Sequence, residues 1–161
     1  MADARLIQAL RRGEGLDRLW QDWGPPTWSI CLGMAPDRAR ARELLADIAR
    51  SLPLAVPGWS LDASICCQMS KLVWQRISIR LELPAPASIE IEAPARTATP
   101  TSDQLRRRLA ACPPEHRVIY LLDLYYRCPS AILAELSGWG EEQVRAARAA
   151  VAWSLVAEEA S

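Results

Sequence analysis

The side chains best suited to recognition chemistry lie near the end of the sequence, in the segment GWGEEQVRAARAAVAWSL at residues 138–155. A glycine-containing turn here separates two expected helices, which is the arrangement of a helix-turn-helix motif, although small helical bundles without a DNA-binding role contain such turns too. On the second helix, Gln143, Arg145 and Arg148 carry the donors and acceptors that base edges and phosphates require. The helix otherwise contains several small side chains, which offer only methyl groups: Ala146, Ala147, Ala149 and Ala150. We therefore expect a helix that forms readily but contacts DNA weakly on its own.

Residues for catalysis or metal binding do not form a recognisable set. His116 is the only histidine, and no nucleophile–base pair or metal-ligand cluster can be assembled around it. We expect no enzymatic activity, no catalytic residue, no metal site and no cofactor. The five cysteines form no CxxC pair, which is typical of a reducing cytoplasm. The adjacent Cys66 and Cys67 could sense redox state; the alternative is that they are buried, unreactive thiols.

Charge and hydropathy limit the possible partners further. The 161 residues contain 19 lysines and arginines and 19 aspartates and glutamates, so the formal net charge is zero. A non-specific nucleic-acid binder would show a strong basic excess, which this chain lacks. The longest apolar runs are far shorter than the roughly 18 residues of a membrane span, and the N-terminal stretch lacks the apolar core of a signal peptide. We expect a cytoplasmic protein without a membrane partner.

Hydrophobic periodicity predicts an all-α fold of two small helical domains, residues 1–80 and 103–161. The first domain is expected to have Asp37 as the N-cap of a central helix, Pro25 and Pro26 opening a separate helix before it, and Ser60 or Asp62 capping the helix after it. A proline-rich linker at residues 81–102 is expected to join the domains. The predicted helices span residues 3–12, 16–23, 26–34, 38–52, 62–80, 103–111, 114–126, 129–136 and 140–157.

The second half of the sequence resembles region 4 of the bacterial extracytoplasmic-function sigma factors. The resemblance rests on the Pro-Pro-Glu-His-Arg opening at 113–117, the Leu-Ala-Glu at 133–135, the glycine turn at Gly138, and the pair Val144-Arg145. The first half resembles region 2 of the same family, with matching residues in the segment PDRARARELLADIARSL. These are Asp37, Arg38, Ala41, Glu43, Leu44, Leu45 and Asp47. The two halves follow the order found in the family and cover most of the chain.

The resemblance implies a role for several residues. Arg38, Glu43, Leu44 and Asp47 would contact the clamp of core RNA polymerase. Residues on two further helices would contact promoter DNA: Lys71, Trp74, Gln75 and Arg76 on the first, and Gln143, Arg145 and Arg148 on the second. The chain departs from the family at Cys66 and Gln68, where a basic residue and a tryptophan are common. For Trp74, packing at the rim of the core is an alternative to stacking on unpaired bases.

Two functions remain open from the sequence. The first is a sigma-like transcription initiation factor that binds core RNA polymerase and promoter DNA, the latter weakly without polymerase. The alternative is a degenerate sigma-fold interaction protein, a partner mimic or scaffold that has lost most DNA contacts. An anti-sigma factor or another protein is a further partner that either function would allow. The alanines near residue 147 and the neutral charge favour the alternative, whereas the helix at 38–52 fits both.

Overall fold

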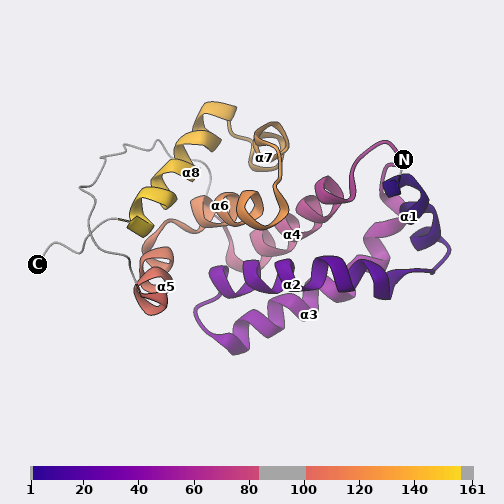
Figure 1. Ribbon diagram of the computed structural model, residues 1–161, viewed down its shortest axis with the longest axis horizontal. Coiled ribbons are helices and arrows are strands. Elements are labelled where there is room, and N and C mark those ends of the chain that lie inside the picture. Colours follow the sequence, from indigo (N-terminus) through magenta and orange to yellow (C-terminus); the bar gives the residue numbers. More distant parts are fainter. Residues whose placement is uncertain (1, 84–100, 157–161) are drawn as a thin grey trace, which may run out of the picture.

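The computed structural model describes residues 2–83 and 101–156, and all the regular elements in these ranges are helical (Figure 1). This confirms the predicted all-α class. The elements of the first range are α1 (Ala2–Arg11), α2 (Leu16–Met34), α3 (Arg38–Ala55), the short 3₁₀ helix η1 (Val56–Gly58) and α4 (Ile65–Leu81). The second range contains α5 (Ser102–Ala111), α6 (Pro114–Tyr126), α7 (Ser130–Ser137) and α8 (Glu141–Val156).

The helix containing Pro25 and Pro26 corrects one prediction. Both prolines lie inside α2, which continues without a break where the sequence predicted the start of a new helix. The side chains before and after the prolines, such as Leu19 and Ile30, are fully buried in the same core. Packing on one core offsets the backbone hydrogen bonds that proline removes from a helix interior. The Thr27 hydroxyl, in the turn after the prolines, donates to the carbonyl oxygen of Trp23 at 2.5 Å.

The helix caps agree with the sequence at α3 and differ at α4. The Asp37 carboxylate accepts a hydrogen bond from the Arg40 amide at 2.8 Å, so the predicted N-cap of α3 is confirmed. The cap of α4 is Ser64, whose hydroxyl accepts from the Cys67 amide at 3.2 Å, and neither Ser60 nor Asp62 fills this role. The indole of Trp59, in the connection before α4, is 4 % exposed and belongs to the core.

One cluster of buried apolar side chains extends through the described parts of both predicted domains. Helix α6 lies between α2 and α8, so its two sides pack against the first and the second half of the chain (Figure 1). The cluster includes Ile30 of α2, Met69 of α4 and Leu122 of α6. The division into two domains therefore stays a prediction, and most of the predicted linker, residues 84–100, lies outside the described residues.

The junction between the two halves centres on Tyr126 at the end of α6. Its hydroxyl shares a 2.5 Å hydrogen bond with Thr27 of α2, and its ring meets that of Trp23 edge-on at 5.0 Å between centroids. Burial raises the pKa of the Tyr126 phenol. Nearby, Gly33 of α2 comes so close to α6 that an added Cβ would lie 2.6 Å from Cδ1 of Leu121. A small residue at Gly33 thus permits the close approach of α2 and α6.

Candidate functional site

The predicted polymerase-binding residues lie on α3, but they do not form one uniform surface. Arg38 and Glu43 are exposed, and Glu43 pairs with Arg40 at 2.8 Å. The side chain of Leu44 is only 5 % exposed and belongs to the core. Glu43 and Arg38 are therefore accessible to a partner, whereas only a small part of the Leu44 side chain is accessible.

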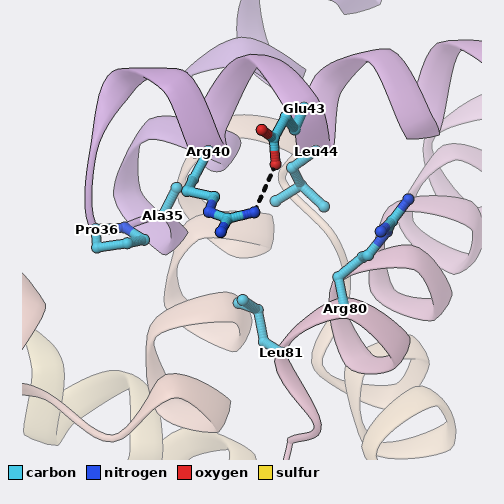
Figure 2. A pocket seen from close by; sticks show the side chains of 7 residues that line it. All are labelled: Ala35, Pro36, Arg40, Glu43, Leu44, Arg80 and Leu81. Atoms are coloured by element: carbon cyan, nitrogen blue, oxygen red, sulfur yellow. Dashed lines mark hydrogen bonds and ion pairs between the residues drawn. The ribbon is translucent and has the colours of Figure 1, made fainter.

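A pocket of about 380 Å³ opens beside Glu43, between the turn that precedes α3 and the end of α4 (Figure 2). Leu44 and Leu81 enter it from opposite sides, and two arginines and one carboxylate surround these apolar groups. This combination suits an apolar side chain of a partner flanked by charged groups. The full lining is Ala35, Pro36, Arg40, Glu43, Leu44, Arg80 and Leu81.

Asp47 has an intrachain role that the sequence did not indicate. Its carboxylate receives a hydrogen bond from Arg80 of α4 at 3.1 Å and lies 3.8 Å from Arg50. The hydrogen bond from Arg80, helped by the charges of the surrounding arginines, lowers the pKa of Asp47. Its side chain is 18 % exposed, so the charge is largely engaged within the molecule. The predicted contact of Asp47 with polymerase would compete with this ion pair between α3 and α4.

The four DNA-binding candidates on α4 point to different surroundings. The ammonium of Lys71 pairs with Glu135 of α7 at 3.0 Å, so this cation joins the two halves of the chain. Trp74 is partly buried against the core, as the rim-packing interpretation expects. Gln75 is exposed, while Arg76 is half-buried with its Nε enclosed. Lys71 and Trp74 are therefore partly engaged within the molecule, whereas Gln75 is exposed.

The three candidates on α8 are all engaged in contacts within their own half of the chain. The Gln143 side-chain oxygen accepts from the Gly140 amide at 2.9 Å, and Arg145 pairs with Glu142 one turn before it. Arg148 contacts Asp123 of α6 at 2.6 Å and donates to the hydroxyl of Ser130 at 3.0 Å. Helix α8 is buried through Val144, Ala147 and Val151, so Ala147 belongs to its packed face, while Ala146, Ala149 and Ala150 are partly exposed. Packing therefore holds α8 in place, and Arg148 adds polar contacts that help to position the helix.

The turn before α8 has the glycine conformation expected of it and one buried aromatic that the sequence did not predict. Gly138 ends α7 with a φ of 72°, in the left-handed region. Trp139 follows in the turn, is 6 % exposed, and meets the ring of His116 edge-on at 5.5 Å. Burial lowers the pKa of His116, which favours the neutral imidazole in this apolar contact. His116 therefore packs against Trp139.

No family model, curated protein or solved structure matches this chain. The likeness to the sigma factors thus rests on the residues quoted from the sequence, and its functional implications stay predictions.

Two further properties concern the ranges 2–83 and 101–156 alone. Within them, no helix is long and apolar enough to cross a membrane. Histidine, cysteine, aspartate and glutamate side chains in these ranges form no group of three or more that could hold a metal ion.

Proposed function

We propose that this chain is a cytoplasmic interaction protein that binds core RNA polymerase through the surface beside Glu43 and does not read promoter DNA through α8 by itself. The observation that carries the proposal is the intrachain engagement of Gln143, Arg145 and Arg148. Base readout needs side-chain donors and acceptors that are free to meet a base edge. In this arrangement DNA would have to displace contacts that already position the helix.

The choice of partner rests on α3. This helix resembles the segment by which sigma factors grip the polymerase clamp, and Arg38 and Glu43 are exposed on it. A pocket with an apolar floor lies beside Glu43, so a partner could bury an apolar anchor and form charged contacts around it. In this proposal, burial of an apolar side chain in the pocket supplies most of the binding energy, and the charges of Arg38 and Glu43 orient the partner.

The second candidate function is that of a sigma-like initiation factor. It is favoured because two of the ion pairs that engage the DNA-binding candidates are exposed to solvent. The side chains of Lys71 and Glu135 are 40 % and 62 % exposed, and Arg145 and Glu142 are 53 % and 86 % exposed. Exposed ion pairs of this kind contribute little to stability, so a polyanion can exchange for the carboxylate at small cost. Polymerase would then have to hold the chain on the promoter and supply most of the binding energy.

Co-purification of the full chain with core RNA polymerase tests the proposal. Glu43→Arg should weaken the complex about tenfold or more, because it reverses a charge at the edge of the pocket. Glu14→Arg is the matched control: Glu14 is 63 % exposed and paired with Arg12, as Glu43 is 65 % exposed and paired with Arg40. Equal affinities for the two variants, or no complex with the unaltered chain, would contradict the proposal.

Anisotropy titration of duplex DNA separates the two candidates. The full chain should bind weakly, with a log–log salt slope no steeper than about −2, because its formal net charge is zero and Arg145 and Arg148 are the only two cations of α8. Arg145→Ala should leave this binding unchanged if the chain is an interaction protein. Promoter-specific run-off transcription by polymerase with the unaltered chain, lost in Arg145→Ala, would instead establish the sigma-like initiation factor.

A further inference from the structure

Helix α5 has no buried residue, whereas every other α-helix within residues 2–83 and 101–156 has at least one. Leu105 and Leu109, one turn apart, nevertheless form an apolar stripe on this helix. A helix with such a stripe ordinarily buries it against neighbouring elements. Helix α5 lies at the edge of the molecule, beside α2 and α8 (Figure 1). Its stripe is therefore only partly covered by the rest of the described chain.

The stripe of α5 forms one wall of an open groove of about 590 Å³ between α2, α5, α6 and α8. Four large apolar side chains that line this groove are between 37 % and 42 % exposed: Leu105, Leu124, Tyr125 and Val156. Elsewhere in the described ranges, the exposed large apolar residues are Leu54 and Ile79. Exposed apolar side chains that gather at a hollow mark an interaction surface.

Contacts within the chain fix the walls of the groove. The Arg108 guanidinium on α5 donates to the carbonyl oxygen of Leu155 on α8 at 3.0 Å. A Cβ added to Gly33 of α2 would lie 2.6 Å from Cδ1 of Leu121 and 3.3 Å from Cδ2 of Leu109, so α2 approaches both α6 and α5 closely. The groove is thus formed without a partner, and binding to it requires little reordering of the chain.

The edge of the groove carries charges of both signs on α5. Arg106 is the only charged residue in the lining, and Asp103 lies one turn before it. Both side chains are exposed, and neither forms an ion pair within residues 2–83 and 101–156. Residues three apart are neighbours on a helix surface. If α5 crosses a second copy of itself in the antiparallel direction, Arg106 of each copy can therefore meet Asp103 of the other.

We propose that this groove binds a second copy of the chain and forms a dimer with two-fold symmetry. A two-fold interface uses the same surface of both copies, so that surface has to be complementary to itself. Here it offers a hollow together with exposed side chains, Leu124 and Tyr125, and α5 adds a cation and an anion that the symmetry pairs twice. The formal net charge of the chain is zero, so long-range repulsion between two copies is small.

The size of the groove sets the expected strength of the dimer. Its lining is smaller than the roughly 20–30 residues that each side of a standard interface contains. We therefore expect a reversible dimer with a dissociation constant of about 1–100 μM. The groove shares no residue with the pocket beside Glu43, so the inference does not depend on the polymerase partner.

Sedimentation velocity of the full chain between about 1 and 200 μM tests the proposal, with monomer expected at the lowest concentration and dimer at the highest. Leu124→Glu should raise the dissociation constant about tenfold or more, because it places a carboxylate in the apolar groove. Leu54→Glu is the matched control: it makes the same change at a leucine that is 81 % exposed and lies outside the groove. The control should leave the dimer unchanged, and circular dichroism checks that both variants are folded.

Charge-reversal variants test the two-fold arrangement itself. Arg106→Asp and Asp103→Arg should each weaken the dimer about three- to tenfold, because each brings like charges together twice. The double variant restores opposite charges and should recover most of the affinity. A double variant no tighter than the single ones, or equal effects of Leu124→Glu and Leu54→Glu, would overturn the proposal. So would a monomer at every concentration, which would leave the groove to residues 84–100 or to a different protein.

Discussion

At the scale of single residues, the two arginines of α8 provide a matched comparison. Arg148→Ala removes both the contact with Asp123 and the hydrogen bond to Ser130, and leaves a carboxylate that is only 25 % exposed without its cation. We expect it to lower the free energy of unfolding by about 1–2 kcal/mol. Arg145→Ala, which removes only an exposed pair with Glu142, should leave it essentially unchanged. Urea titrations compare the two, and equal losses would contradict the structural role of Arg148.

Asp47 gives a residue-scale prediction about pH. The hydrogen bond from Arg80 lowers the pKa of Asp47 in the folded protein below the ordinary value of 3.8. The ionised carboxylate therefore stabilises the folded state, and this contribution is fully present at a pH above 3.8, where Asp47 is ionised in the unfolded chain as well. This contribution is lost as the pH falls through the lowered folded pKa. Asp47→Asn should therefore be less stable than the unaltered chain near pH 6, with a difference that shrinks below pH 3.8.

Urea midpoints measured across this pH range check the Asp47 prediction. Asp62→Asn is the control, because the exposed Asp62 side chain forms no ion pair within residues 2–83 and 101–156. A stability difference between Asp47→Asn and the unaltered chain that stays constant down to the acid limit would show that the contact with Arg80 does not operate in solution.

At the scale of elements, the turn from α7 to α8 depends on the backbone of Gly138. Its φ of 72° is unfavourable for side chains with a Cβ, although an added Cβ would meet no atom within 4 Å. Gly138→Ala should therefore lower the free energy of unfolding by about 1 kcal/mol through backbone strain alone. Gly58→Ala is the control, since it has the same open space without a positive φ. Thermal melts should separate the two variants, and similar melting temperatures would mean that the turn relaxes.

At the scale of the whole molecule, the shared core predicts that the two halves unfold together. Leu121 of α6 is 3 % exposed and approaches Gly33 of α2, so Leu121→Ala should cost about 2–4 kcal/mol and shift a single unfolding transition. Leu124→Ala, on the same helix but 39 % exposed, should cost less than about 1 kcal/mol. Tryptophan fluorescence and circular dichroism should follow the same curve. Two separate transitions, with only one shifted by Leu121→Ala, would instead establish two independent domains.

The sequence by itself determined the helical elements, because hydrophobic spacing and caps act within a few residues. Helix α6 spans 114–126 as predicted, and Asp37 caps α3 as predicted. The apolar residues of α4 that recur at helical spacing are buried: Ile65, Met69, Leu72, Val73 and Ile77. Local rules were wrong at Pro25 and Pro26, where burial on both sides of the prolines keeps α2 continuous. They also placed the start of α4 too early: the helix begins at Ile65, with Ser64 as its N-cap.

Only the tertiary structure decided which partner each polar side chain has. Asp47 meets Arg80, Arg148 meets Asp123 and Lys71 meets Glu135, and no local spacing relates the members of these pairs. Residues in the sequence show charge and reactivity, but pairing depends on how helices cross, and the packing of α6 between α2 and α8 sets those crossings. The sequence could therefore place the candidate residues on α3 and α8, but it could not show which of their side chains are free to contact a partner. That difference arises because an ion pair requires distances that packing alone sets.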